Sequence, residues 1–330
     1  MGEMTIRRKA VLVVGGAGYI GSHMVKALCA EGYRVLVLDD LSTGHRKLVT
    51  GGQWIQGKMG DGGLLDRILE ANPVDSVMHF AACSIVGESV RSPLPYYQNN
   101  VAETIALLEA LRRHKIRKLI FSSSAAVYGE PDRVPIRETQ NCRPTNPYGK
   151  TKLCIEGLLA DCGTAYGLRS ICLRYFNAAG ADASGRIGEL HDPETHLIPL
   201  VLRCAQTAQP IKVYGCDYPT PDGTCIRDYV HVNDLAQAHL LALAALEDGH
   251  GSDVFNLGNN TGHSVRQVIE LAAKVSGRPI HSLDCERRPG DPAVLVADSS
   301  RIRSRLNWQP RYEALETMIE SAWKWHTGNH

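Results

Sequence analysis

The sequence predicts an α/β fold in which a doubly wound parallel sheet is followed by a smaller mixed α/β region. Three observations support this class. Short β-branched runs alternate with longer helix-like segments through the first half of the chain, as in parallel sheets covered on both faces. Each connection between these runs is long enough for a helical crossover, which parallel strands require. Beyond residue 177, prolines divide the chain into shorter elements, which favours a second, smaller region.

The expected elements follow in chain order. Strands are expected at residues 10–14, 34–38, 54–56, 75–80, 118–122 and 169–175. Helices between them are expected at residues 20–30, 63–71, 99–113 and 148–165. In the second region, helices are expected at 232–246, 264–275 and 315–325, short strands near Val213, Phe255 and Val296, and an exposed loop at 217–223. We therefore expect two domains, residues 1–180 and 181–330, with some crossing of the chain between them.

Charge and cysteine usage exclude several classes of function. The 330 residues include 36 Lys and Arg against 35 Asp and Glu, so no net charge attracts nucleic acid or an anionic membrane. The ten cysteines form no CxxC pair and no metal-ligand spacing, so no metal is predicted. No secretory signal and no membrane-spanning run of about 18 apolar residues is visible. Together with cysteines that lie in apolar runs, these observations predict a cytoplasmic protein.

A glycine-rich turn follows the first expected strand. Gly15, Gly18 and Gly21 lie between that strand and a helix, which directs backbone N–H groups and the positive helix end at one point. Asp39 ends the next strand about 20 residues later, where a carboxylate accepts ribose hydroxyls. A plain tight turn and a loop acid would not require this spacing. No arginine adjoins Asp39 to hold a 2′-phosphate, so the sequence predicts a Rossmann-like domain that binds NAD rather than NADP.

A second group of polar residues suits proton transfer. Ser124 follows a central strand, at the sheet edge where α/β proteins bind ligands. Tyr148 and Lys152 lie one turn apart on a predicted helix and share a face. A lysine cation lowers the pKa of a nearby phenol, so we expect Tyr148 to act as the base while Ser124 orients the reacting oxygen. A serine-rich loop and an exposed Tyr–Lys pair are the alternative interpretation.

These residues belong to a series of motifs through which the chain resembles the UDP-glucose 4-epimerase family of nucleotide-sugar epimerases, within the extended short-chain dehydrogenases/reductases. The motifs extend nearly from end to end: residues 15–22 (GGAGYIGS), 86–89 (VGES), 121–124 (FSSS), 146–152 (NPYGKTK), 174–177 (RYFN), 222–224 (DGT), 227–232 (RDYVHV) and 287–291 (RRPGD). The resemblance implies an isomerase that interconverts UDP-galactose and UDP-glucose. Bound NAD would oxidise C4 of the hexose, and the 4-ketohexose would be reduced on its other face.

The resemblance also implies a role for each matching position. Catalysis is assigned to Ser124, Tyr148 and Lys152, which also face cofactor and sugar. Cofactor contacts are assigned to Gly15, Gly18, Tyr19, Ile20, Gly21, Asp39, Asp40, Leu41, Ser42, Thr43, Gly44, Lys58, Met59, Phe80, Ala81, Ala82, Ser84, Asn99 and Phe176. Substrate contacts are assigned to Asn177, His196, Leu197, Tyr214, Arg227, Arg288, Asp291 and Leu295, with the two arginines suited to a UDP diphosphate.

Three positions depart from the family pattern near the cofactor. Asp40 stands where asparagine is common, Lys58 where an aspartate often meets the adenine, and Ser84 where lysine is frequent. The resemblance further implies a homodimer that pairs through the helices at 99–113 and 148–165. We expect residues 1–180 to bind NAD and residues 181–330 to bind the UDP-sugar.

Rival functions differ at identifiable residues. Nucleotide-sugar 4,6-dehydratases need an acid and a base after the strand-end hydroxyl, where this chain has Ala125 and Ala126. A 4-epimerase of UDP-pentoses or of UDP-N-acetylhexosamines stays open, and Leu295 falls where the family lines the sugar pocket. Leu295 also fits an ordinary apolar strand. A non-catalytic NAD-binding regulator would not need Ser124, Tyr148 and Lys152.

Overall fold

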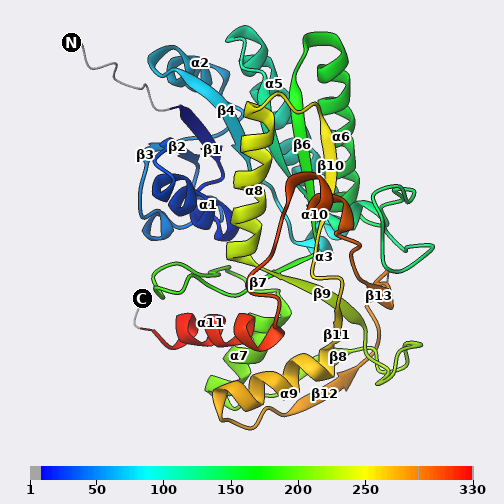
Figure 1. The fold of residues 1–330 in the computed structure, drawn as a ribbon. Coiled ribbons are helices and arrows are strands. Elements are labelled where there is room, and N and C mark those ends of the chain that lie inside the picture. The colour runs from blue at the N-terminus through cyan, green and yellow to red at the C-terminus, as the bar shows by residue number, and fades with distance from the viewer. Residues whose placement is uncertain (1–8, 289, 329–330) are drawn as a thin grey trace.

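The expected α/β fold with a doubly wound parallel sheet is confirmed. A computed structural model describes residues 9–288 and 290–328 of the chain (Figure 1). Its main sheet has seven strands, all parallel, in the order β10-β6-β5-β4-β1-β2-β3. These strands are β1 (Ala10–Val14), β2 (Arg34–Asp39), β3 (Gln53–Gln56), β4 (Val74–His79), β5 (Lys118–Ser124), β6 (Arg169–Tyr175) and β10 (Asp253–Leu257).

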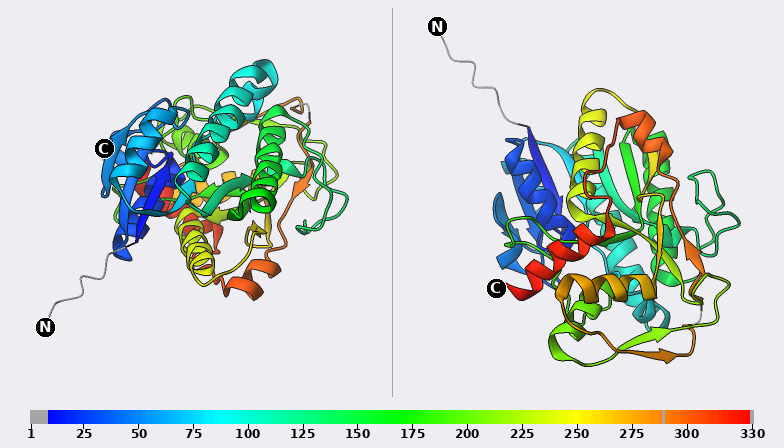
Figure 2. Two further views of the ribbon diagram at one scale, coloured as in Figure 1. Left: turned by 90° about the horizontal axis from the view of Figure 1, so that it is seen from above. Right: turned by 60° about the horizontal axis from the view of Figure 1, so that its bottom comes forward.

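Helices cover both faces of this sheet because side chains alternate along each strand. On β1, Val11 and Val13 pack into the core on one face, whereas Leu12 and Val14 pack into the core on the other. The first face carries α1 (Tyr19–Ala30), α8 (Val232–Glu247) and α10 (Ser300–Leu306). The second carries α2 (Gly62–Ala71), α5 (Glu103–Arg113) and α6 (Pro147–Tyr166), and the left view of Figure 2 shows the two layers.

The strand order reverses between β1 and β4. Chain order runs outward from β1 through β2 and β3 on one side, and from β4 through β5 and β6 on the other. Loops that leave the carboxyl ends of β1 and β4 therefore diverge and leave a crevice, which is where such sheets bind ligands.

The segment before α5 differs from the expected continuous helix. Residues 86–102 form α3 (Val86–Arg91), α4 (Pro93–Tyr96) and a π-helical segment, η2 (Tyr97–Ala102), and α5 begins only at Glu103. Pro93 and Pro95 interrupt regular helix formation here. π-Helical turns are rare and frequent at functional sites, and this one contains Asn99.

A smaller region lies below the sheet in Figure 1. Its strands are β7 (Asn177–Ala179), β9 (Ile226–His231), β11 (Gly262–Ser264) and β13 (Val294–Leu295), with β8 (Ile211–Tyr214) paired to β12 (Ser282–Cys285). Its helices α7 (Leu197–Thr207), α9 (Val265–Ser276) and α11 (Leu315–Thr327) share one apolar core. Helix α9 begins one residue later than expected, because Ser264 caps it in a capping box with Gln267.

The chain crosses between the two regions, and the domain division at residue 180 stays a prediction. Although they follow residue 180, β10, α8 and α10 pack with the main sheet. Conversely, β7 leaves the end of β6 and pairs with β9. None of the helices in the described residues combines the length and apolar character that crossing a membrane requires.

Candidate active site

The turn after β1 requires glycine at two positions for reasons of packing. Gly15 has φ +81°, and a Cβ atom there would lie 2.4 Å from the backbone nitrogen of Ala81. A Cβ atom on Gly21 would lie 2.1 Å from the carbonyl oxygen of Gly15. These two glycines therefore let α1 and the loop after β4 approach the turn closely.

Gly18 has a different environment. A Cβ atom there would meet only the Gly15 carbonyl oxygen, at an ordinary 3.5 Å. Gly18 is the N-cap of α1, and no side chain caps that helix end. The amide groups of Tyr19 and Ile20 begin the helix, where backbone N–H groups lack intrahelical acceptors. Packing within the chain does not require glycine at this position. The open space beside Gly18 and the free backbone N–H groups instead suit the pyrophosphate of a dinucleotide.

Asp39 braces the glycine turn. Its carboxylate accepts hydrogen bonds from the backbone N–H of Ala17 at 2.8 Å and of Leu41 at 2.9 Å. Burial raises the pKa of Asp39, and these two backbone N–H groups oppose the rise. Gly44 adjoins the same carboxylate, since its Cβ would lie 3.0 Å from Oδ1. The sequence predicted only a contact between Asp39 and the ribose. It did not predict the hydrogen bonds by which Asp39 holds the glycine turn.

The remaining predicted cofactor residues lie on loops at the carboxyl ends of neighbouring strands. Phe80 and Ala81 follow β4, and both N–H groups donate to the Val14 carbonyl, at 2.8 and 3.2 Å. Lys58 and Met59 follow β3. Burial raises the pKa of Glu103, and the nearby positive charge of Lys58 opposes the rise. The loop after β2 holds Asp40, Leu41, Ser42, Thr43 and Gly44, and the loop after β4 holds Ala82 and Ser84.

Sequence reasoning missed Asn100, which fixes the loop after β4. Its amide accepts from the Cys83 N–H at 2.8 Å and donates to the Cys83 carbonyl at 3.0 Å. The same amide nitrogen donates to Thr151 Oγ1 on α6 at 3.0 Å. Asn99 donates to the Asn100 side chain at 2.9 Å. The predicted cofactor residue Asn99 is thereby connected to the helix of Tyr148.

Local sequence brings Ser124 and Tyr148 together. Asn146 caps α6 by accepting from the Gly149 N–H at 2.9 Å. A Cβ atom on Gly149 would lie 2.4 Å from the carbonyl oxygen of Ala126, so the first turn of α6 packs on the turn that follows Ser124. This packing sets the Ser124 hydroxyl near the Tyr148 phenol, where it acts to lower the pKa of that phenol. The structure therefore brings these two predicted residues together, and their catalytic roles stay a prediction.

Lys152 is buried one turn further along α6. The residue is only 2% exposed, and its Nζ donates to the Ser122 carbonyl at 2.7 Å. Nζ lies 4.8 Å from the centre of the Phe121 ring and 5.8 Å from the centre of the Tyr148 ring. The ammonium group thus lies between β5 and the ring of the predicted base.

Without a cofactor, the pKa shift of Tyr148 is opposite in direction to the lowering that the sequence predicted. Burial raises the pKa of Tyr148, and the nearby Ser124 hydroxyl opposes the rise. Burial also lowers the pKa of Lys152 to about 7, against the opposing charge of Glu156. Burial disfavours both the phenolate and the ammonium, so the ion pair that the expectation required is not favoured without further charge in the site.

A buried ion pair lies behind Lys152. Glu156, one turn beyond it on α6, pairs with Arg174 at 2.9 Å and accepts from the Ser123 hydroxyl at 2.6 Å. Ser122, whose carbonyl binds Lys152, hydrogen-bonds the Tyr175 hydroxyl through its own side chain. Glu156 continues the spacing of Tyr148 and Lys152 along α6, which was the available sequence signal.

Five of the eight predicted substrate residues lie on β8, β9 and β13 or on the loop between β12 and β13. Arg227 on β9 forms an ion pair with Asp291, and its backbone pairs in register with Leu295 on β13. The Arg288 guanidinium lies 4.0 Å from the centre of the Tyr214 ring. Leu295 packs against the cluster that contains Ala125 and Phe176, which places it beside the residue after Ser124. Asn177 donates to the Asp228 carbonyl at 2.9 Å. Pro289 lies outside the described residues.

His196 and Leu197 lie apart from this group in their contacts, at the start of α7. His196 hydrogen-bonds Glu189, which also accepts from His191 at 3.1 Å. Although burial opposes it, the neighbouring carboxylates raise the pKa of His191 to about 10. The His191 ring meets the Tyr19 ring edge-on, with centres 6.3 Å apart, so this segment adjoins the glycine turn.

Known proteins resemble this chain over most of its length. The model of the NAD dependent epimerase/dehydratase family matches residues 11–258. A UDP-glucose 4-epimerase of Halalkalibacterium halodurans is 52% identical over 318 residues, which cover 96% of this chain and 95% of that protein.

Solved structures agree with the sequence comparison. UDP-glucose 4-epimerase from Brucella ovis in complex with NAD superposes with a TM-score of 0.92 at 47% identity, over 95% of this chain and 97% of that one. The Bifidobacterium longum UDP-glucose 4-epimerase, solved with NAD+ and UDP, gives a TM-score of 0.92 at 38% identity, over 97% and 98% of the two chains. By sequence and by fold, this chain belongs to the NAD-dependent epimerase/dehydratase family.

Proposed function

We propose that this chain interconverts UDP-galactose and UDP-glucose by transient oxidation at C4 with bound NAD. One observation carries the proposal: Tyr148 lies beside Ser124 at the end of β5, with Nζ of Lys152 5.8 Å from the centre of the Tyr148 ring. The matches to UDP-glucose 4-epimerases over nearly the whole chain support the choice of substrate class.

The residues around the glycine turn fit a dinucleotide. Gly18 leaves open the space that a pyrophosphate needs, and the first turn of α1 supplies backbone donors. Asp39, at the end of β2, would accept the adenosine ribose hydroxyls with the carboxylate that also braces the turn. When bound, NAD supplies the acceptor that takes a hydride from C4 of the hexose and returns it.

The three catalytic side chains divide the proton chemistry. Tyr148, as phenolate, takes the proton of the O4 hydroxyl while the C4–H bond breaks, and returns the proton when C4 is reduced on the opposite face. Because burial raises the pKa of Tyr148, its phenolate needs the Lys152 cation and the positive charge of the oxidised cofactor. Ser124 hydrogen-bonds O4 and keeps it in line with the phenol.

Two neighbouring residues limit the reaction to epimerisation. Ala125 and Ala126 follow Ser124, at the positions where a dehydratase needs an acid and a base. Methyl groups transfer no protons, so the 4-ketohexose can only be reduced again. The chain therefore lacks, next to its strand-end serine, the groups that would eliminate water.

The arginines on the second region would hold the UDP diphosphate. Arg227 and Arg288 present forked donors, which bind phosphate oxygens well. Arg227 is paired with Asp291 and Arg288 is stacked on Tyr214, so each guanidinium has a defined position. The UDP in the Bifidobacterium longum structure supports this class of ligand.

The substrate assay compares the alternatives that the sequence left open. Purified chain would be incubated with UDP-galactose, UDP-glucose, UDP-xylose and UDP-N-acetylglucosamine, and kcat/KM measured for each. We expect the highest values for the two plain hexoses. A preference for UDP-xylose would identify a pentose epimerase, and NAD binding without turnover of any sugar would identify a regulator.

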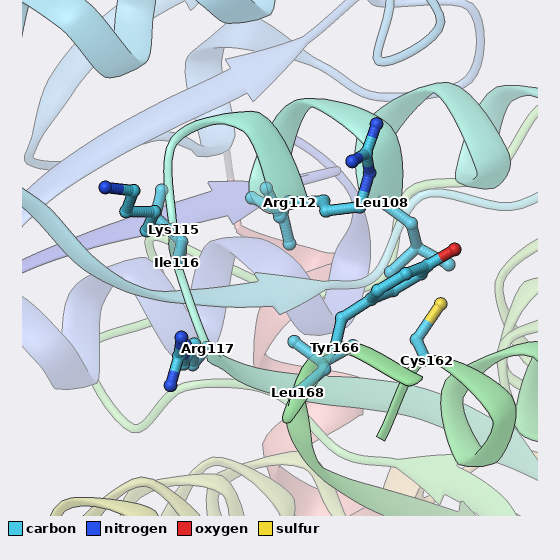
Figure 3. A pocket seen from close by; sticks show the side chains of 9 residues that line it. Leu108, Arg112, Lys115, Ile116, Arg117, Cys162, Tyr166 and Leu168 are labelled. Atoms are coloured by element: carbon cyan, nitrogen blue, oxygen red, sulfur yellow. The ribbon is translucent and has the colours of Figure 1, made fainter. Parts of the chain in front are cut away.

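We also propose a homodimer formed through α5 and α6. Of the eight large hydrophobic side chains exposed among the described residues, six lie on α3, α4, η2, α5 and α6, so apolar exposure is concentrated on these helices. They are Val86, Val90, Leu94, Tyr97, Ile105 and Tyr166. A cavity of about 230 Å³ lies between the ends of α5 and α6, lined by Leu108, Arg112 and Tyr166 among others (Figure 3).

Light scattering tests this assembly. We expect the mass of a dimer, with Leu94→Asp plus Ile105→Asp shifting it toward a monomer. Leu283→Asp is the matched control, because Leu283 is also exposed but lies on β12. A monomeric wild-type chain would contradict the proposal.

A cytoplasmic location is also proposed, because all ten cysteines are free.

A further inference from the structure

The loop that precedes α7 gathers four residues of metal-binding type. Glu189, His191, Glu194 and His196 lie within eight consecutive positions. One ligand atom from each lies within 4.8 Å of those of the other three. Sequence analysis considered cysteine spacing and predicted no metal, so this Glu-x-His-x-x-Glu-x-His pattern was overlooked.

Both imidazoles face the same carboxylate oxygen. Nδ1 of His191 lies 3.1 Å from Glu189 Oε1, and Nδ1 of His196 hydrogen-bonds that same oxygen. Nδ1 of His191 also lies 3.8 Å from Glu194 Oε1. The two nitrogen and two oxygen atoms therefore converge on one point rather than forming separate surface pairs.

The charges of these four side chains are balanced only by one another. The side chains of Glu189 and Glu194 are 5% and 10% exposed. Within residues 9–288 and 290–328, no lysine or arginine lies within 4 Å of either carboxylate, and only the two histidines do. Two nearly buried carboxylates side by side are stabilised by positive charge, which a divalent cation would supply in place of the two protonated imidazoles.

Hydrogen bonds to and from the backbone hold the segment that carries these ligands in place. The Glu189 carbonyl accepts from the Trp325 indole on α11 at 2.9 Å. Oε1 of Glu194 accepts from the N–H groups of Thr195 and His196 at 2.7 and 2.8 Å. Hydrogen bonds of this kind orient carboxylate ligands in metal sites.

We propose that Glu189, His191, Glu194 and His196 bind one divalent transition-metal ion, of which Zn²⁺ fits best. Two imidazole nitrogens and two carboxylate oxygens form a tetrahedral set of the kind Zn²⁺ accepts. Ligands about 2.0–2.1 Å from a tetrahedral ion lie about 3.4 Å apart. The separations of His191 Nδ1 from Glu189 and Glu194, 3.1 and 3.8 Å, fit this spacing, whereas the His196 ring would have to move away from Glu189 when the ion binds. Binding releases the Nδ1 protons of both histidines, so a doubly charged ion replaces two protons without changing the net charge.

The ion would have a structural role that does not depend on the proposed function, and His196 would then bind the ion rather than make the substrate contact that the resemblance assigns to it. The ion would tie the loop after β7 to the start of α7, and this loop contacts Tyr19 on α1 through His191. All four protein ligands fill the coordination set, which is the arrangement of structural rather than catalytic zinc sites. The ion therefore stabilises the fold around the glycine turn and takes no part in hydride or proton transfer.

Cobalt serves as the spectroscopic probe. Full-length chain without an affinity tag is dialysed against a chelator and titrated with Co²⁺, whose tetrahedral complexes absorb visible light strongly. We expect one Co²⁺ per chain, displacement by one equivalent of Zn²⁺, and a higher thermal midpoint in the presence of Zn²⁺.

Variants locate the ion. His191→Gln and Glu194→Gln should each weaken binding by at least tenfold. His250→Gln should not, because His250 pairs with Asp253 at 3.3 Å outside the cluster. Circular dichroism confirms that the variants fold. If the wild-type chain leaves Co²⁺ and Zn²⁺ unbound, or if both variants bind like wild type, the site does not exist.

Discussion

The Nζ atom of Lys152 lies 5.8 Å from the centre of the Tyr148 ring, while it donates its hydrogen bond to the Ser122 carbonyl. Lys152 is buried and Tyr148 is half-buried, so water stabilises neither charge fully. Burial lowers the pKa of Lys152 to about 7 and raises that of Tyr148. Activation of the phenol therefore depends on charge that arrives with the bound cofactor.

The titration of Lys152 makes stability depend on pH. The unfolded side chain has a pKa of about 10.4, whereas burial lowers the folded value to about 7. Between these values the unfolded chain binds more protons at this residue, so its contribution to the free energy of unfolding rises with pH in that window. Below it, both states are protonated and the penalty of burying the charge is full.

Lys152→Met should remove this penalty. In urea unfolding without added cofactor, we expect the variant to gain stability over wild type at about pH 6.5, and the gain to shrink by about pH 9.5. An equal gain at both pH values would show that the Lys152 pKa is not lowered.

Two glycine substitutions separate packing from cofactor binding. Gly15→Ala should cost about 1–3 kcal/mol of stability, because Gly15 has φ +81° and no room for a Cβ atom. Gly18→Ala should leave stability nearly unchanged, since its backbone has φ −76° and the Cβ has space.

The added methyl group at residue 18 would nevertheless occupy the proposed pyrophosphate position. We expect Gly18→Ala to lose the rise in thermal midpoint that NAD gives the wild-type chain. If Gly18→Ala and wild type gain equally from NAD, the pyrophosphate does not bind at this turn.

Leu295 should limit the size of the sugar. It is half-buried, packs with Phe176 and Ala125, and pairs in register with Arg227. We expect efficient turnover of UDP-galactose and weak turnover of UDP-N-acetylgalactosamine. Changing an apolar pocket by a methylene-sized amount shifts discrimination by about 1–3 kcal/mol. Leu295→Tyr should therefore reduce the N-acetyl activity at least tenfold and spare the plain hexose, whereas an equal response of both would make Leu295 a packing residue.

Tyr148→Phe should nearly abolish turnover. The change removes the proton acceptor but keeps the aromatic ring. General acid–base catalysis contributes about 10²- to 10⁴-fold, so kcat should fall by at least that range while NAD and UDP binding persist. A loss in kcat smaller than tenfold would mean that another group is the base.

Local sequence was sufficient to predict the main elements of this site. The glycine turn, Asp39 and the Tyr148–Lys152 pair each depend on residues close in sequence, whose spacing on a strand or helix fixes their position. The same holds for the parallel sheet, because apolar runs and crossover lengths are local properties.

Features that depend on distant contacts could not be predicted. Asn100 connects Cys83 to Thr151, and Arg174 reaches Glu156, pairs that only the fold brings together. The rise in the pKa of Tyr148 that burial causes in the chain alone could not be predicted, for the same reason. A sequence shows that Lys152 is near, but it does not show that both groups are removed from water.

The central claim is that one bound cofactor oxidises and re-reduces the same carbon atom. The most direct measurement uses UDP-galactose deuterated at C4, incubated with the purified chain without added NAD and analysed by mass spectrometry and by NADH absorbance. We predict UDP-glucose that retains the deuterium at C4, with no NADH released in proportion to substrate. Loss of deuterium to solvent, or NADH that accumulates in step with substrate consumption, would contradict this mechanism.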